Sequence, residues 1–274
     1  MSTPYIIYAV FAFLLGAVVG SFLNVCICRL PHGESVVSPP SHCPKCDYQI
    51  RWYDNIPILS YLLLKGKCRS CGAPISIQYP MVELLNGLLA LALFCKFFPA
   101  GFLEVAPPGA MLMPAFFFAI LFVFCSALVT ITFIDLEHQI IPDVITLPGI
   151  VLGFILSFFI PQLGWFNSLI GIVGGGGSLL LIAWLYQAVA KKDGMGGGDV
   201  KLLAMMGAFL GWKAILFIVF VASLLGSVIG VTLMVIRKKD STLAIPFGPF
   251  LASAAVLYIF YGRRIIHWYL TLGS

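Results

Sequence analysis

The chain has 274 residues, of which 61% are hydrophobic and only 10% are charged, and its formal net charge is +5. Soluble domains carry roughly 25% charged residues, so this composition excludes an ordinary soluble enzyme. It predicts an all-α polytopic membrane protein, whose partners include membrane lipid and no nucleic acid. The net charge itself decides little, because the placement of Lys and Arg sets the orientation of a chain in a bilayer.

Apolar runs of about 20 residues, the length that spans a bilayer as a helix, recur along the chain. The first, 5–28, lacks the basic start and small-residue cleavage site of a signal peptide, so we expect a retained helix. A short run, 200–212, would be about 20 Å long as a helix, and it either spans with help from its flanks or is partly re-entrant. The other runs are 81–99, 114–134, 144–161, 166–190, 214–236 and 244–262. We therefore expect about eight transmembrane helices.

A long polar insertion, 29–80, separates the first two spans and carries more basic than acidic residues. Basic loops favour the cytoplasmic side of a membrane, so we expect the insertion there. Threading eight spans from this point places six further basic residues on the cytoplasmic side: Lys191, Lys192, Lys201, Arg237, Lys238 and Lys239. Four face outward, Lys96, Lys213, Arg263 and Arg264, of which the last two argue mildly against this topology.

Small residues recur at helical spacing inside several spans. Gly16 pairs with Gly20 and Gly226 with Gly230, and Gly174–Gly177 form a run. Such residues let membrane helices approach closely, and we expect that role for all three groups. A phosphate-binding loop at 174–177 is excluded because no Lys-Ser or Lys-Thr follows.

The insertion contains two CxxC pairs, CPKC at 43–46 and CRSC at 68–71, with 21 residues between them. Each pair can supply two thiolates, so together they predict a closed, structural four-sulfur zinc site in a ribbon-like insertion. The spacing is one residue longer than the usual range of about 15–20. Two disulfides or a redox CxxC are the alternatives, and a reducing cytoplasm disfavours the first. We expect His42, Cys26, Cys28, Cys95 and Cys125 to lie outside the metal site.

Two carboxylates fall at the cytoplasmic edge of predicted spans, Asp135 and, 64 residues later, Asp199. If the fold brings them together, one can hold a proton while the other acts as a base, which is sufficient to hydrolyse an amide. The alternatives are a helix-ending charge for Asp135 and a helix N-cap for Asp199, behind Gly196–Gly198. Asp143 resembles a cap of the fourth span, with a supporting contact to the acids as the alternative. Glu83 and Lys201 are expected to make polar contacts within the bundle.

Several stretches together make the chain resemble the type IV prepilin peptidases, membrane enzymes that cleave the leader of prepilins and N-methylate the new terminus. They cover nearly the whole chain in order: GSFLNVCICRLP at 20–31, the two CxxC pairs, SIQYPMVELLNG at 76–87, IDLEHQIIPDVITLPG at 134–149, GMGGGDVKLLAMMGAFLGW at 194–212 and IPFGPFLA at 245–252. Members are GxGD aspartyl proteases. The resemblance implies that Asp135 and Asp199 are the catalytic pair.

The resemblance also implies a cofactor, substrates and a location. The methyl donor is S-adenosylmethionine, and methylation is associated with the cysteine-bearing domain. The substrates are type IV prepilins or type II secretion pseudopilins, with Gly before the cleaved bond and usually Phe after it. We expect a multi-pass protein of the bacterial inner membrane, with the active site and zinc domain facing the cytoplasm. The expected parts are a first helix, 1–28, a zinc domain linked to methylation, 29–80, and a peptidase domain, 81–274.

Other functions stay open from the sequence: a broader GxGD intramembrane protease, an ion transporter or channel, and a membrane thiol oxidoreductase. The methyl-donor site has no glycine-rich dinucleotide motif to mark it. We expect any such pocket to combine the 29–80 insertion with the adjoining bilayer surface, and Gly66, Lys67 and Glu83 are no more than candidates. Gly196–Gly198 are expected to let a substrate segment approach Asp199.

Overall fold

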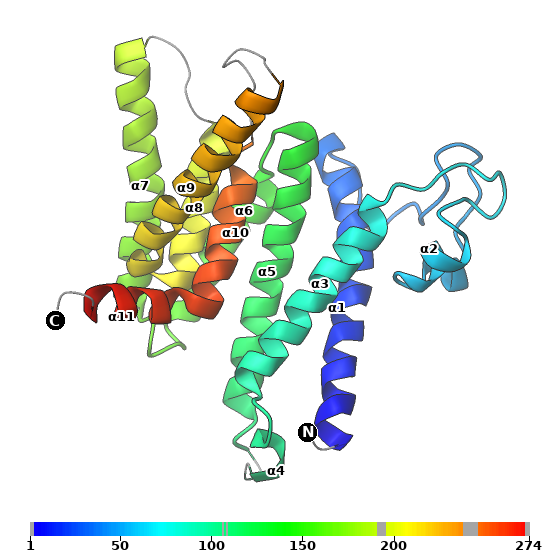
Figure 1. The fold of residues 1–274 in the computed structure, drawn as a ribbon, viewed down its shortest axis with the longest axis horizontal. Helices are drawn as coiled ribbons and strands as arrows, with labels where there is room; N and C mark the ends of the chain where they lie inside the picture. The colour runs from blue at the N-terminus through cyan, green and yellow to red at the C-terminus, as the bar shows by residue number, and fades with distance from the viewer. Residues whose placement is uncertain (1–2, 106, 108, 191–195, 238–245, 272–274) are drawn as a thin grey trace. The chain divides into compact units, whose positions relative to one another are not determined.

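The computed structural model describes residues 3–105, 107, 109–190, 196–237 and 246–271. In these residues the regular elements are helical, and the chain divides into two compact units, Met1–Thr130 and Ile131–Ser274 (Figure 1). Besides the helices, the described residues contain two isolated β-bridges, His42 with Gln49 and Lys67 with Pro74. The all-α prediction is confirmed.

The N-terminal unit contains two long helices that pack side by side, α1 (Thr3–Arg29) and α3 (Gln78–Phe97), and most of α5 (Leu112–His138). Gly16 and Gly20 make the close approach possible, because a Cβ on Gly16 would lie 2.8 Å from the Gly87 Cα. Asn86 is fully buried on α3, donates to the Gly16 carbonyl at 2.8 Å and accepts from the Ser126 hydroxyl of α5 at 3.0 Å. One buried amide thus connects three helices, as polar side chains do between membrane helices.

Short elements connect these helices. The insertion after α1 contains two 3₁₀ turns, η1 (Leu30–His32) and η2 (Trp52–Asn55), and the short helix α2 (Leu59–Leu63). Another short helix, α4 (Phe102–Val105), lies between α3 and α5.

The C-terminal unit is arranged around α8 (Gly197–Leu210), whose residues 202–208 are all buried. The helices that contact it are α6 (Asp143–Ser157), α7 (Trp165–Ala190), α9 (Trp212–Arg237) and α10 (Gly248–Leu257). The unit ends with η3 (Tyr258–Gly262), a π-helical turn, and α11 (Arg263–Thr271). Because α8 is enclosed by protein, its apolar residues are explained by packing and do not require contact with lipid.

Five helices are long and apolar enough to cross a membrane: Thr3–His32, Gln78–Phe97, Leu112–His138, Trp165–Leu185 and Trp212–Ile236. They correspond to five of the eight expected spans. The apolar helices Asp143–Ser157 and Gly248–Gly262 are shorter, and α8 has only 14 residues. A 15-residue helix rises about 22 Å against a hydrocarbon core of about 30 Å. The count of eight is therefore not confirmed by helix length among the described residues.

The glycine predictions have mixed outcomes. Gly175 lies against the Leu203 backbone of α8, as expected, whereas no described residue lies within 4 Å of a Cβ on Gly174 or Gly177. The expected close packing at Gly226 is wrong, because a Cβ on Gly226 would lie at an ordinary 3.5 Å from its nearest neighbour, the Phe250 ring. The predicted cytoplasmic lysines at 191, 192, 238 and 239, and the first residues of the expected span 244–262, lie outside the described residues.

Candidate functional site

Asp135 lies near the end of α5, in the C-terminal unit, and is only 5% exposed. Its Oδ2 accepts the backbone N–H of Gly248 at 2.9 Å. Gly248 is the first residue of α10, and the first N–H groups of a helix have no partner within the helix and attract anions. A Cβ on Gly248 would lie 2.5 Å from this carboxylate oxygen, so only glycine fits here without a shift.

Asp199 is the third residue of α8, and the N-cap position belongs to Gly196, which makes no side-chain cap hydrogen bond. The N-cap interpretation of Asp199 is therefore wrong. Its Oδ1 is buried and has no hydrogen-bond partner within the described part of the chain. The Asp135 carboxylate is close enough to interact with Asp199 electrostatically. Buried carboxylate oxygens in proteins accept hydrogen bonds, and a water or a substrate group can supply the donor for this one.

The turn after α5 brings the two acids into one cluster. Gln139 adopts a positive φ of 55°, which ends α5, and Ile141 follows in the connection to α6. A Cβ on Gly198 would lie 2.8 Å from the Ile141 Cβ, and a Cβ on Gly248 would lie 3.4 Å from the Ile141 Cδ1. Ile141 thus packs against the glycine before Asp199 and the glycine that binds Asp135.

Asp143 and Lys201 lie beside this cluster and form an ion pair between α6 and α8. The Lys201 Nζ donates to both Asp143 carboxylate oxygens at 2.7 Å. The expectation that Asp143 caps the fourth span is wrong, because Pro142 occupies the N-cap position and no side-chain cap bond forms. The ion pair ties the first turn of α6 to the turn of α8 that carries Asp199.

The two acids differ in surroundings in a way that suits acid–base chemistry. Asp135 accepts a backbone N–H, which favours a carboxylate, whereas the Asp199 Oδ1 lacks any donor within the described residues. Two neighbouring carboxyl groups in such unequal surroundings tend to share one proton. The arrangement can therefore activate a water at one group while the other group donates a proton to the carbonyl oxygen of the bond to be cleaved.

The four cysteines of the insertion form a second cluster, within the N-terminal unit. The sulfur atoms of Cys43, Cys46, Cys68 and Cys71 all lie within 4.8 Å of one another. Four sulfurs at about 2.3 Å from a tetrahedral zinc would be about 3.8 Å apart, and the Cys43 and Cys71 sulfurs are separated by 3.9 Å. The donor set and its spacing fit a zinc ion with no open coordination position.

The two CxxC segments have the same local structure. The N–H of the residue after each pair, Asp47 or Gly72, donates to the carbonyl of the first cysteine at 2.9 and 3.0 Å. Both residues have positive φ, 53° and 70°. Backbone N–H groups within the second segment lower the pKa of the Cys68 thiol to about 7. The Ala73 N–H acts in the same direction on Cys71, but the neighbouring thiols and burial outweigh it and raise the pKa of Cys71 to about 11.

Other polar residues of the insertion hold it in place. The Arg69 guanidinium pairs with Asp54, whose side chain is only 4% exposed, at 2.6 Å. The Glu83 Oε2 of α3 accepts the N–H of Ile58 at 2.7 Å. Glu83 therefore fixes the insertion to α3, whereas the expectation was a polar contact within the helix bundle. His42 binds the Pro40 carbonyl at 3.2 Å and takes no place in the sulfur cluster.

Comparison with known proteins also separates the region of the cysteine cluster from the region of the two acids. Residues 14–97 match the Bacterial Peptidase A24 N-terminal domain, and residues 122–231 match the Type IV leader peptidase family. A relative from Pseudomonas aeruginosa, named prepilin leader peptidase/N-methyltransferase, is 38% identical over 95% of this chain and 93% of its own length. This chain belongs to the type IV leader peptidase family. No solved structure matches it.

Two more members of the family carry the same name. The Aeromonas hydrophila relative is 36% identical over 97% of this chain and 94% of its own length. The Myxococcus xanthus relative is 40% identical over 83% of this chain and 64% of its own length. In this member of the family, the sulfur cluster lies within the matched N-terminal domain and both acids lie within the matched peptidase domain.

The sequence did not predict that the Gly248 N–H donates a hydrogen bond to Asp135. Gly248 belongs to the IPFGPFLA stretch, where the resemblance was noted but no role was assigned. A proline next to a glycine at this point indicates the start of a helix. Nothing in the sequence indicates that this N-terminus meets an aspartate 113 residues away.

Proposed function

We propose that this chain is a bifunctional membrane enzyme. It cleaves the leader peptide of type IV prepilins or type II secretion pseudopilins, and then N-methylates the new N-terminal residue with S-adenosylmethionine. The observation that carries the proposal is the cluster in which Asp135 accepts the Gly248 N–H while Asp199 has a buried oxygen without a partner in the described chain. The names of the relatives support both activities.

In the proposed cleavage, Asp135 is the general base and Asp199 the general acid. Asp135 removes a proton from water as the water oxygen adds to the scissile carbonyl carbon, and Asp199 donates its proton to the carbonyl oxygen. The tetrahedral intermediate then breaks its C–N bond, and the amine leaves with the proton that Asp135 took up. The intermediate's hydroxyl proton returns to Asp199 as the carbonyl re-forms. The products are a leader carboxylic acid and a new N-terminal amine, and the acid pair keeps one proton.

The second activity needs a methyl donor, and S-adenosylmethionine supplies an electrophilic methyl group on sulfur. The unprotonated amine forms the N–C bond as the S–C bond breaks, and one amine proton is released to water. In the proposed organisation, the zinc domain at 29–80 serves methylation and residues 81–274 form the peptidase. The zinc held by Cys43, Cys46, Cys68 and Cys71 is structural, because the four sulfurs leave no position for a reacting group.

The proposed topology has about eight transmembrane helices in a bacterial inner membrane, with the insertion and both acids toward the cytoplasm. The basic residues of the insertion support this orientation. Among the short helices, α8 is included as a span because neighbouring helices enclose it, and α6 and α10 are included as apolar helices that contact α8.

Mass spectrometry of a purified prepilin incubated with the full-length enzyme and S-adenosylmethionine tests both activities together. We expect cleavage after the leader glycine and addition of one methyl group to the new N-terminus. A prepilin that is cut with equal efficiency after replacement of this glycine would point to a broader intramembrane protease instead. An uncut prepilin would refute the proposal.

A further inference from the structure

The last helix, α11 (Arg263–Thr271, sequence RRIIHWYLT), differs from the apolar helices before it. On its apolar side, Trp268 is 62% exposed and Tyr269 is 72% exposed, and the Ile265 side chain between them is also exposed. The polar residues recur at helical spacing and share the other side: Arg263, Arg264, His267 and Thr271. Basic residues on one side and aromatic residues on the other are typical of a helix that lies in a membrane interface.

α11 does not continue the direction of α10. The chain leaves α10 through the π-helical turn η3, and Figure 1 shows α11, in red, running across the end of α10. A Cβ on Gly262, the last residue of this turn, would collide with the Tyr258 ring, so glycine lets the ring lie against the backbone here. Because α10 is proposed as a span, α11 runs more nearly in the plane of the membrane.

Contacts within the C-terminal unit place α11 at the end where α7 and α9 begin. The indole N–H of Trp212, the first residue of α9, donates to the Asn167 Oδ1 near the start of α7 at 3.2 Å. The Tyr258 ring, just before α11, lies 5.6 Å from the Phe217 ring of α9. Both helices contain segments that are long and apolar enough to cross a membrane, Trp165–Leu185 and Trp212–Ile236. Their first residues therefore mark one membrane interface, and α11 lies at that level.

Aromatic residues with a polar group gather at the same level. α7 and α9 both begin with a tryptophan, Trp165 and Trp212, and α11 adds Trp268 and Tyr269. All four side chains are exposed. Trp and Tyr are enriched where a membrane meets water, because the body of each ring is apolar and its N–H or O–H is polar. This end of the unit thus has the composition expected at the level of lipid headgroups.

The basic side of α11 fits a phospholipid surface. Arg264 and His267 are exposed there, and both ion pairs of the described residues lie elsewhere in the fold. A guanidinium pairs with phosphate oxygens through parallel N–H groups, and phosphates form the headgroup level of a bilayer. The two arginines of α11 argued against the proposed topology when they were taken as charges of an outward loop. An interfacial helix gives them a separate reason to be there, because headgroup phosphates occur on both faces of a membrane.

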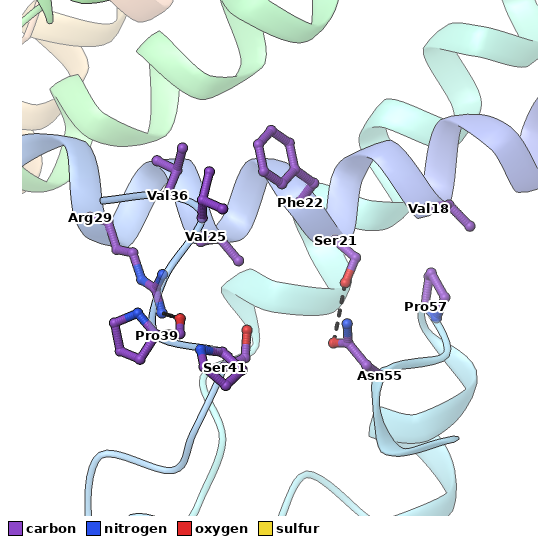
Figure 2. Close-up of a pocket in the computed structure, with 12 residues that line it drawn as sticks. Val18, Ser21, Phe22, Val25, Arg29, Val36, Pro39, Ser41, Asn55 and Pro57 are labelled. Atoms are coloured by element: carbon purple, nitrogen blue, oxygen red, sulfur yellow. Dashed lines mark hydrogen bonds between the residues drawn. The ribbon is translucent and has the colours of Figure 1, made fainter. Parts of the chain in front are cut away.

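The arginine that ends α1 shows the contrasting case, in which the protein itself satisfies the guanidinium. Arg29 donates to the Ser35 carbonyl at 2.9 Å and to the Pro39 carbonyl at 2.7 Å (Figure 2). These bonds hold the insertion against the helix, beside a cavity of about 330 Å³ between the two. No hydrogen bond or ion pair of this kind joins Arg264 to another residue that the structure describes.

We propose that α11 lies in the plane of the membrane interface and binds phospholipid headgroups. Ile265, Trp268 and Tyr269 insert toward the acyl chains, and the Arg264 guanidinium pairs with a headgroup phosphate. The contact anchors the end of α10 that is opposite Gly248, the residue that binds Asp135. It rests on the proposed span of α10 and does not depend on the reaction that the acids catalyse.

Fluorescence of the full-length, zinc-loaded protein in nanodiscs of phosphatidylcholine and phosphatidylglycerol tests this placement. The emission lost in Trp268→Phe is the contribution of Trp268. Trp52→Phe is the matched control, because it removes a tryptophan of the insertion that is 81% exposed. Lipids brominated high on the acyl chain quench indoles in the interface, whereas iodide quenches indoles in water. We expect bromolipid to quench most of the Trp268 contribution and iodide to quench most of the Trp52 contribution.

A second pair of variants tests the phosphate contact, each compared with the same variant carrying Trp268→Phe. Arg264→Gln should lower the ratio of bromolipid to iodide quenching of Trp268 about fivefold, as expected for the loss of one basic residue at an anionic membrane surface. Arg264→Lys keeps the charge and should give the wild-type ratio. Zinc content and prepilin cleavage at wild-type levels show that each variant is folded.

Quenching of the Trp268 contribution by iodide, without quenching by bromolipid, would overturn the proposal by placing α11 in water. Protection from both quenchers would also overturn it, because protein would then cover this face. Equal quenching ratios in the wild type and Arg264→Gln would overturn the phosphate contact. A prepilin left uncut by a wild-type enzyme with the expected quenching would refute the peptidase function alone.

Discussion

At the scale of single residues, the acid cluster depends on two groups with opposite surroundings. The Asp135 carboxylate accepts a hydrogen bond from the Gly248 N–H at the start of α10. The Asp199 Oδ1 is buried and has no hydrogen-bond donor in the described chain. We interpret this missing donor as a property of the site, which a water or a peptide group supplies during the reaction.

Replacing either acid with its amide tests their proposed roles. We expect Asp135→Asn and Asp199→Asn each to lower the cleavage rate about 10²–10⁴-fold or more, because each removes a proton-transfer group. Prepilin cleavage followed by gel shift measures the rate, and zinc content reports the fold. Glu34→Gln is the control, because it makes the same acid-to-amide change at an exposed residue of the insertion, in the other compact unit. A fully active Asp199→Asn enzyme would show that Asp199 is not a catalytic residue.

The glycines before Asp199 differ in the room around them, although they are adjacent in sequence. A Cβ on Gly198 would lie 2.8 Å from the Ile141 Cβ, whereas nothing in the described chain lies within 4 Å of a Cβ on Gly197. We expect Gly198→Ala to reduce cleavage at least about tenfold by moving Asp199 relative to Asp135. Gly198→Val should have a larger effect, and Gly197→Ala should be close to wild type. Equal activity of the two alanine variants would show that this contact does not position the acid.

At the scale of helices, α8 owes its central place to the small residues of its neighbour α7. Gly171 of α7 packs directly on the Gly207 backbone of α8, and Gly175 packs on the Leu203 backbone. The Ser168 hydroxyl donates to the Ala208 carbonyl at 2.8 Å in the same interface. Close backbone approach of this kind compensates for the weak hydrophobic drive between helices in lipid.

Alanine at Gly171 should therefore separate the two helices. The new methyl group would meet the Gly207 backbone, and overpacking of this kind costs about 1–3 kcal/mol or more. We expect a lower melting temperature in detergent and reduced cleavage, since α8 carries Asp199. Gly174→Ala is the matched control on α7, because its Cβ would have no neighbour within 4 Å in the part of the chain that the structure describes. Equal melting temperatures for the two variants would contradict the packing role of Gly171.

At the scale of the whole molecule, the two clusters belong to different compact units. The four sulfurs lie in Met1–Thr130 and the two acids in Ile131–Ser274. The two units are each built with their own buried contacts, such as Asn86 in the first and residues 202–208 of α8 in the second. Because the sulfur cluster and the acid pair belong to different units, we expect that a mutation can impair one activity without the other.

Loss of one zinc ligand should impair N-methylation and leave prepilin cleavage largely intact. We expect Cys68→Ser to abolish stoichiometric zinc binding and to reduce methylation far more than cleavage, because the cluster holds the insertion in the N-terminal unit and the acid pair belongs to the C-terminal unit. Zinc analysis and mass spectrometry of the product measure the two effects. Cys95→Ser is the control, because this exposed cysteine lies outside the cluster. Equal loss of both activities would mean that the zinc module supports the entire fold.

The sequence by itself determined the helical membrane class, the four-sulfur cluster and the two acids to be tested. These features are encoded locally: hydropathy over about 20 residues predicts a span, and each CxxC pair places two thiolates within one short turn. The resemblance added the roles of Asp135 and Asp199, which remain predictions.

Only the tertiary structure decided which groups meet. The Gly248 N–H on Asp135, the Asp143–Lys201 ion pair in place of a helix cap, and the packing of Gly171 on Gly207 all join segments far apart in the chain. The cavity beside α1 likewise needs the insertion to fold back on the helix that precedes it. Such contacts are not encoded in the spacing of neighbouring residues, because they depend on how whole helices pack, and packing is a property of the complete fold.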